Sequence, residues 1–237
     1  MSGISDFVTS ERRGSATIVH LDDGKANALS KDMIAAIRSA IDEASADPDV
    51  SAVVLHGRPG KFSAGFDLSV MTAGDLGAVV DLVADGGDLV HAIYAAPVPV
   101  VAACTGHALA AGALMLLACD VRVGAAADCK IGLNEVAIGM VLPRWALTIA
   151  TERLSRRHLQ RAVATARVTD GTGAVDAGFL DEAVPADAVL DRAVEVAEGM
   201  AALDRTAYAG TVRALRTPVL DTMAAQILHD RDSGTAV

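Results

Sequence analysis

The chain has 237 residues, and its 20 Lys and Arg against 30 Asp and Glu give a net charge of −10. Apolar residues make up 52% and aromatic residues only 3%, so the interior has to be built from Ala, Val, Leu and Ile. This apolar content excludes a disordered chain. An acidic balance with few rings for base stacking argues against a nucleic-acid partner.

Cysteine usage and the first residues predict a cytoplasmic protein. Cys104, Cys119 and Cys129 form no CxxC pair, so we expect buried free thiols in a reducing compartment. Residues 1–13 contain no apolar stretch of the kind that a secretory signal needs. Residues 89–119 carry no Asp, Glu, Lys or Arg, but prolines and a glycine divide them into pieces shorter than the ~20 residues of a membrane span. We therefore expect no membrane association.

The expected secondary structure alternates strands with helices. Apolar and β-branched runs predict strands at residues 17–21, 52–56, 98–103, 121–124 and 129–133. Apolar residues at helical spacing predict helices between Ser30 and Pro48, over 76–94 and over 110–118. This alternation is typical of an α/β domain with crossover connections. After about Leu147 the pattern is nearly all helical, which predicts a core over residues 1–147 and a C-terminal helical region over 148–237.

Several common site signatures are absent. Residues 57–61 (GRPGK) lack the glycine spacing of a phosphate-binding loop, and residues 171–173 (GTG) lack the third glycine of a dinucleotide loop. Ser63 lacks the glycine two residues earlier that a nucleophile elbow requires. The histidines form no HExxH spacing, so we expect no metal site. Covalent serine catalysis and metal-assisted hydrolysis are therefore both disfavoured.

Two segments combine a strand end with very small residues: 61–68 (KFSAGFDL) and 104–112 (CTGHALAAG). Small side chains let a ligand approach the main chain closely enough to meet peptide N–H groups. The second segment also begins a helix, where unpaired N–H groups favour negative charge. Two convergent N–H donors would make an oxyanion hole. The alternative is that these small residues only permit tight packing of a strand against a helix.

Five motifs in order resemble the enoyl-CoA hydratase/isomerase (crotonase) superfamily. They are residues 23–29 (DGKANAL), 62–68 (FSAGFDL), 105–112 (TGHALAAG) running on to Cys119 and Asp120, 134–139 (NEVAIG) and 174–180 (AVDAGFL). The resemblance implies an α/β fold made of a spiral of ββα units, with a C-terminal helical region used to form a homotrimer or a dimer of trimers. It also implies an acyl-CoA substrate and no separate cofactor, since coenzyme A is part of the substrate.

The resemblance assigns roles to particular residues. The backbone N–H groups of Ala64 and Ala111 would bind the thioester oxygen, and Glu135 matches one of the two glutamates of a typical hydratase. The residues that fall on motifs expected to line the substrate or its coenzyme A part are Lys25, Ala26, Ala28, Leu29, Ala64, Gly65, Phe66, Asp67, Leu68, His107, Gly112 and Leu114. Among them, His107 is either a substrate-lining residue or a histidine packed beside a helix start, and Asp67 is expected to fix its own loop.

One departure from the family pattern changes the expected chemistry. Leu114 stands where the second glutamate is expected, so Glu135 alone would have to carry protons. One carboxylate suffices to move a proton between two carbons of an enolate, whereas water addition is helped by two. The apolar neighbour would raise the pKa of Glu135 by desolvation. The sequence thus favours double-bond isomerisation or weak hydration, with a non-catalytic acyl-CoA binder, or another thioester reaction such as hydrolysis or decarboxylation, as the alternatives.

Overall fold

The computed structural model describes residues 7–234, so the outermost parts of the two expected regions, residues 1–6 and 235–237, lie outside the described residues. The strands are β1 (Val8–Arg13), β2 (Ala16–Leu21), β3 (Ala28–Leu29), β4 (Ala52–Gly57), β5 (Gly60–Ser63), β6 (Gly65–Phe66), β7 (Val100–Cys104), β8 (Gly106–Leu109), β9 (Val121–Ala125), β10 (Ile131–Gly132) and β11 (Glu182–Val184). The helices are α1 (Lys31–Ala46), α2 (Leu68–Met71), α3 (Leu76–Tyr94), α4 (Ala111–Ala118), α5 (Arg144–Arg153), α6 (Leu159–Val163), α7 (Gly171–Ala177), α8 (Val189–Gly199) and α9 (Arg205–Ser233). Short 3-10 helices are η1 (Val136–Ile138), η2 (Ala186–Ala188) and η3 (Met200–Ala202).

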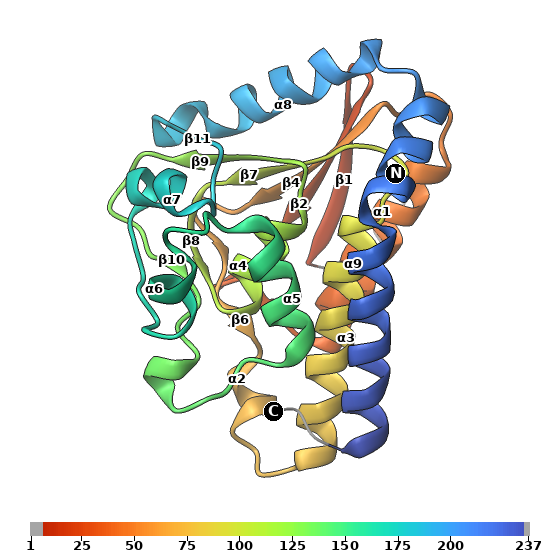
Figure 1. The fold of residues 1–237 in the computed structure, drawn as a ribbon. Coiled ribbons are helices and arrows are strands. Elements are labelled where there is room, and N and C mark those ends of the chain that lie inside the picture. The colour runs from red at the N-terminus through yellow and green to blue at the C-terminus, as the bar shows by residue number, and fades with distance from the viewer. Residues whose placement is uncertain (1–6, 235–237) are drawn as a thin grey trace.

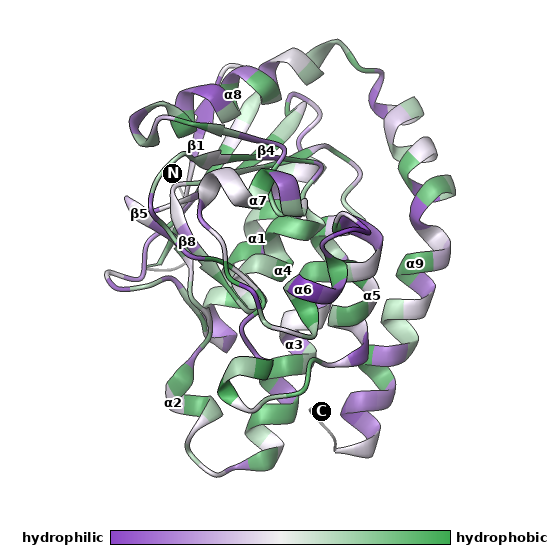
Figure 2. Ribbon diagram, turned by 60° about the vertical axis from the view of Figure 1, so that its left-hand side comes forward, coloured by the Kyte–Doolittle hydropathy of each residue, from purple (hydrophilic) through white to green (hydrophobic). Residues whose placement is uncertain are grey.

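The larger sheet has the strand order β1-β2-β4-β7-β9-β11, with β1 antiparallel to β2 and the other neighbours parallel. Alternate side chains of its strands enter two different cores because successive residues of a strand point to opposite faces. Ile18 and Val54 pack with α8, which lies across one face (Figure 1). Val19 and Val53 belong to the larger core beneath the other face, which includes residues of α1, α3, α4 and α5. Figure 2 shows α4 as almost uniformly hydrophobic, as expected for a helix whose residues are all buried.

The chain repeats one unit as it moves along the sheet. The strands β4, β7 and β9 enter the large sheet, and the strands that follow them, β5, β8 and β10, form a second parallel sheet in the order β10-β8-β5. The helices α3, α4 and α5 follow the successive strand pairs. This is the ββα spiral that the family resemblance implied, and it brings β6 and β8 into contact with α4.

Most predicted elements are present. Ser30 caps α1 by accepting a hydrogen bond from the N–H of Met33, and α3 occupies the predicted residues. The three cysteines are free and buried, as predicted. Within residues 7–234, no helix is both long enough and apolar enough to cross a membrane.

The structure corrects two expectations about the ends of the domain. The sequence did not predict β1, because its mostly exposed residues VTSERR carry no apolar pattern. The region after residue 147 is not purely helical, since β11 pairs with β9 in the large sheet, and residue 147 itself lies inside α5. The expected boundary therefore cuts through one packed unit.

Helix α9 closes the molecule along α3 and α5 (Figure 1). Arg216 in its middle forms a buried ion pair with Asp120, donates to the carbonyl of Tyr94 at 2.8 Å, and lies 4.4 Å from the centre of the Tyr94 ring. Asp120 also accepts the N–H of Val100 at 2.7 Å, so this carboxylate connects α9 to the start of β7. The C-terminal helix is thus fixed to the core of its own chain, and the expected trimer stays a prediction.

Candidate active site

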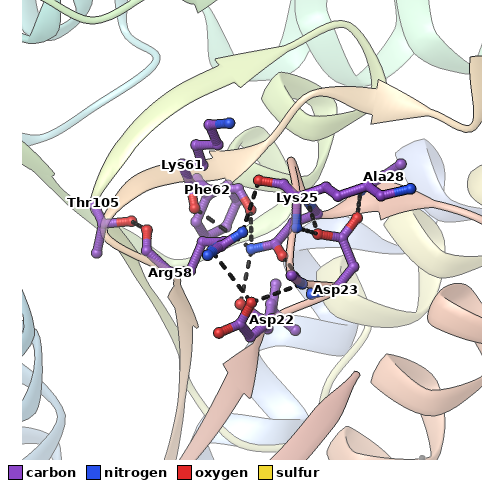
Figure 3. Close-up of polar contacts among 11 residues, drawn as sticks. Asp22, Asp23, Lys25, Ala28, Arg58, Lys61, Phe62 and Thr105 are labelled. Carbon is purple, nitrogen blue, oxygen red and sulfur yellow. Dashed lines mark hydrogen bonds and ion pairs between the residues drawn. The ribbon is translucent and has the colours of Figure 1, made fainter. Parts of the chain in front are cut away.

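The loop from Asp23 to Leu29 is held by one carboxylate. Asp23 accepts hydrogen bonds from the N–H groups of Lys25 (2.7 Å), Asn27 (2.8 Å) and Ala28 (2.9 Å), as Figure 3 shows for Lys25 and Ala28. Burial alone would raise the pKa of this carboxyl, but the backbone donors outweigh it and the pKa is lowered. A loop fixed in this way presents Lys25 and Ala26 in a defined position.

Asn27 ties that loop to the segment after β5. It has a φ of 52°, and its buried side chain donates to the carbonyls of Leu21 (2.8 Å) and Phe62 (3.1 Å). Ser63 donates its hydroxyl to the carbonyl of Asn27 at 2.7 Å, and the N–H of Ala64 donates to the carbonyl of Ala26 at 3.0 Å. The N–H of Ala64 is therefore already used, and the prediction that it serves as an oxyanion donor is wrong.

The N–H of Phe66, two residues further on, is the available donor of this segment. Strand β6 pairs with β3 on one side only, and the N–H of Asp67 donates to the carbonyl of Leu29 in β3 at 3.2 Å. Because successive N–H groups of a strand point to opposite sides, the N–H of Phe66 faces away from β3, along the unpaired edge of β6.

The second donor lies at the start of α4. Ala111 is the first residue of this helix, so its N–H has no acceptor within the helix, and the described residues provide no other. Ala110, which precedes it, has a φ of 49° and no side chain that could cap the helix. This strained backbone leaves the N–H of Ala111 without an acceptor among the described residues, and its expected role in binding the thioester oxygen stays a prediction.

The two donor segments touch each other, and glycines make this possible. A Cβ atom on Gly65 would lie 3.0 Å from the carbonyl oxygen of Leu109 and 3.3 Å from the nitrogen of Ala111. A Cβ atom on Gly112 would lie 2.5 Å from the carbonyl oxygen of Ser63. The small residues therefore serve close packing, and this packing brings the peptide of Phe66 next to the peptide of Ala111.

Beside these peptides lies a cavity of about 370 Å³. Its walls are mostly apolar, and among the described residues Glu135 is the one carboxylate in them. The lining residues are Ala64, Phe66, Leu68, Met71, Val83, Leu109, Ala110, Leu114, Asn134, Glu135, Ile138, Met140, Val141, Pro143 and Trp145. Such a cavity fits an apolar chain with one group that can exchange a proton.

Glu135 is positioned by the turn that follows β10. Its carbonyl accepts the N–H groups of Ile138 (3.0 Å) and Met140 (2.9 Å), which fixes the loop that starts at Asn134. The side chain is buried, its Oε2 has no hydrogen-bond partner among the described residues, and burial raises the pKa of Glu135 to about 7. Leu114, 1% exposed, lines the same cavity and offers this carboxyl no polar contact. A carboxyl with this pKa is half ionised at neutral pH and can accept or return a proton.

The other residues predicted to bind the substrate or its coenzyme A part lie in different surroundings. Lys25 is exposed and Ala26 and Ala28 are half-buried on the loop surface, whereas Leu29 packs into the hydrophobic core and can offer a ligand only its backbone. His107 does not line the cavity, and its Nδ1 accepts the N–H of Lys130 at 2.9 Å. The prediction of a substrate-lining role for His107 is therefore not supported by its position, and its packed alternative agrees with this contact.

The remaining residues of this group lie near the mouth of the cavity. Asp67 caps α2 by accepting the N–H of Ser69 at 2.8 Å, so it fixes its own loop as predicted. Leu68 lines the cavity and is 69% exposed. Arg58 lies beside the loop that starts at Asp23, where it pairs with Asp22 (3.2 Å) and donates to the carbonyl of Lys25 (2.9 Å), as Figure 3 shows.

Sequence reasoning missed three features of the site. It placed the first oxyanion-hole donor at Ala64, whereas the alternation of N–H groups along β6 leaves the N–H of Phe66 free. From the sequence, Trp145 could line either the acyl end of the site or a subunit contact, and Asn134 is not singled out. Both line the cavity with buried polar atoms that have no partner among the described residues. No local pattern marks these residues, because the cavity forms from segments far apart in the chain.

Comparison with known proteins identifies the family. The enoyl-CoA hydratase/isomerase family model matches residues 11–235. A family member from Pseudomonas syringae has a TM-score of 0.93 and 37% identity, covering 97% of this chain and 99% of that one. A Mycobacterium tuberculosis protein described as an enoyl-CoA isomerase is 40% identical with a TM-score of 0.89, covering 95% of this chain and 97% of that one. A second structure of the same protein describes it as a probable enoyl-CoA hydratase and is 41% identical, with a TM-score of 0.89. An enoyl-CoA hydratase of Mycobacterium marinum is 38% identical with a TM-score of 0.88, covering 95% and 98%.

The chain therefore belongs to the enoyl-CoA hydratase/isomerase family and is an enzyme of hydratase/isomerase type with the fold of that family.

Proposed function

We propose that this enzyme isomerises the double bond of an unsaturated acyl-CoA through a thioester enolate. The observation that carries the proposal is that Glu135 is the one carboxylate in the cavity wall formed by the described residues, with Leu114 in place of a second acid. Water addition is helped by two positioned carboxylates, whereas a shift of the double bond needs one group that takes a proton and gives it back.

The proton transfer balances within the substrate. The Glu135 carboxylate removes a proton from the α-carbon of a 3-enoyl-CoA, and the electron pair moves onto the thioester oxygen. The N–H groups of Phe66 and Ala111 stabilise this oxyanion, a contribution that in other enzymes is worth about 10²–10³-fold in rate for each donor. The protonated Glu135 then returns its proton to the γ-carbon, and the double bond forms between the α- and β-carbons.

The basic residues near Lys25 support a position for the coenzyme A part of the substrate. The thioester oxygen would sit between the loop that ends at Phe66 and the start of α4, which directs the rest of the ligand toward the loop that carries Lys25. Lys25 and Lys61 are exposed there, next to Arg58. In a chain with a net charge of −10, local basic groups of this kind would attract the phosphates.

Ultraviolet absorbance of the conjugated enoyl thioester tests the proposal. We expect a 3-enoyl-CoA substrate to gain this absorbance in the presence of the enzyme, and Glu135→Gln to slow the gain by about 10²–10⁴-fold. Crotonyl-CoA should lose its absorbance slowly or not at all. Fast loss would identify a hydratase, and saturable binding without either change would identify a non-catalytic binder, so each outcome would overturn the proposal.

A gain-of-function variant tests the role of Leu114. Leu114→Glu would place a second carboxyl in the cavity that Glu135 lines, and we expect this variant to hydrate crotonyl-CoA at least ~10-fold faster than the wild type. Leu114→Gln is the matched control, because it has similar size but cannot exchange a proton. Equal hydration by both variants would contradict the idea that the missing acid limits water addition.

A further inference from the structure

Two adjacent glycines lie in the middle of α3, at a position where the helix itself does not need them. Gly86 and Gly87 are buried ten and eleven residues into a helix of 19 residues. Glycine is the poorest helix former after proline, so a buried pair in a helix interior indicates that something else occupies the space of the missing side chains.

The space at Gly86 is filled by the ring of Phe66. A Cβ atom on Gly86 would lie 2.3 Å from Cε1 and 2.5 Å from Cζ of this ring, both far closer than real contacts allow. Phe66 carries the N–H that we assign to the oxyanion hole, and its ring lines the cavity that holds Glu135. The ring is thus held between α3 on one side and the cavity on the other.

The space at Gly87 is filled by side chains of α5 and α9. A Cβ atom there would lie 3.0 Å from Cε2 of Trp145 and 2.9 Å from Cγ1 of Ile227 in α9. Arg231 of α9 pairs with both neighbours of the glycines, Asp85 and Asp88, at 2.9 Å each, and so fixes α9 against α3 at this level. Figure 1 shows α9 running along α3. Because Trp145 also lines the cavity, the glycine pair supports both of its aromatic walls.

We infer that Gly86 is a positioning residue that sets the depth of the acyl cavity by seating the Phe66 ring, and thereby admits long acyl chains. This inference rests on the proposed function, since it takes the cavity to be the acyl site. A methyl group on Gly86 must displace the ring, and the cavity is the open space beside it. The displaced ring would occupy room in the cavity that otherwise receives the acyl chain, so substrates long enough to reach that room lose binding while shorter ones keep it.

The magnitude follows from the number of methylenes excluded. Each methylene withdrawn from an apolar site lowers affinity by about fourfold, so a ring that takes the room of two methylenes lowers it by about 15-fold. We therefore expect Gly86→Ala to reduce kcat/KM for 3-dodecenoyl-CoA by about 15-fold and for 3-hexenoyl-CoA by less than about threefold. Equal losses for the two chain lengths would overturn the inference.

Gly77 provides the matched control. It lies in the same helix, and a Cβ atom there would meet one atom within 4 Å, Oδ1 of Asp75 at an ordinary 3.4 Å. Gly77→Ala should leave the ratio of the two kcat/KM values unchanged. A change in that ratio as large as the one in Gly86→Ala would mean that any alanine in this helix alters the site, and would also overturn the inference.

A second pair of variants tests whether Gly86 acts through the ring. In a Phe66→Ala background the added methyl group has nothing to displace, so Gly86→Ala should then have no further effect on chain-length preference or on folding. This comparison also decides the case in which Gly86→Ala alone does not fold. A loss that persists in the Phe66→Ala background would refute a role through Phe66.

Binding of saturated ligands separates this inference from the proposed reaction. Calorimetry with dodecanoyl-CoA and hexanoyl-CoA needs no turnover, and Gly86→Ala should weaken the first about 15-fold and the second little. A wild-type protein that binds both but isomerises no 3-enoyl-CoA refutes the proposed function alone. Equal weakening of the two saturated ligands refutes the role of Gly86 alone.

Discussion

Replacing Glu135 with glutamine should make the protein more stable at alkaline pH while it slows proton transfer. Burial raises the pKa of this carboxyl from 4.5 to about 7, so the folded chain binds its proton more tightly than the unfolded chain does. Between these two pH values the free energy of unfolding falls as the pH rises, because the carboxylate is better solvated in the unfolded state. Glutamine stays neutral and avoids this loss.

The structure gives the size of the effect. A rise in pKa from 4.5 to about 7 corresponds to about 3 kcal/mol, at ~1.36 kcal/mol for each tenfold change in proton affinity. The loss is small near pH 5 and complete above about pH 7. We therefore expect the stability gained by Glu135→Gln to grow by about 2 kcal/mol between about pH 5 and pH 8.

Urea denaturation followed by circular dichroism at the two pH values measures this difference. Subtracting the wild-type value at each pH cancels the titration of all other groups. Glu43→Gln, on an exposed position of α1, is the matched control and should show no comparable pH dependence. A gain from Glu135→Gln that is equal at both pH values, or a loss at pH 8, would refute the view that burial without a partner raises this pKa.

Three further predictions follow from the site and its support. The kcat/KM for a 3-enoyl-CoA should rise about tenfold per pH unit below about pH 7 and level off above it, because Glu135 must be ionised to take the first proton; a flat pH profile would contradict its role as the base. Gly65→Ala should lower kcat by about 10²-fold, because a Cβ atom there separates the two donor peptides. Gly74→Ala is the control: Gly74 has a similar positive φ of 82° and open space around it, so this variant should keep full activity. Equal losses in the two variants would point to backbone strain instead. Asp120→Ala should lower the free energy of unfolding by about 3 kcal/mol or more, because it leaves the buried guanidinium of Arg216 unpaired; urea denaturation would measure this, and a loss below about 1 kcal/mol would show that Arg216 finds another partner.

The fold could be predicted well because its signals are local. Buried parallel strands appear in the sequence as short apolar runs, and α3 appears as helical spacing that ends before two prolines. Strand β1 could not be predicted, because an edge strand with mostly exposed side chains carries no apolar pattern and depends on its pairing with β2. Strand β11 has three half-buried residues, and its place in the sheet depends on β9.

The candidate site could be predicted in part. The presence of Glu135, of Leu114 and of the small residues that let two segments touch can be seen in the sequence, because each depends only on which residue type stands at a given position. Which peptide N–H is free depends on hydrogen bonds between distant segments. The carbonyl of Ala26 accepts the N–H of Ala64, and the pairing of β6 with β3 fixes the direction of the N–H of Phe66. The depth of the cavity depends on how α3, α5 and α9 pack around two rings. Composition and spacing thus determine which groups the protein has, whereas only tertiary packing decides which of them are left unpaired, since a hydrogen bond is satisfied or left open by neighbours that are remote in the chain.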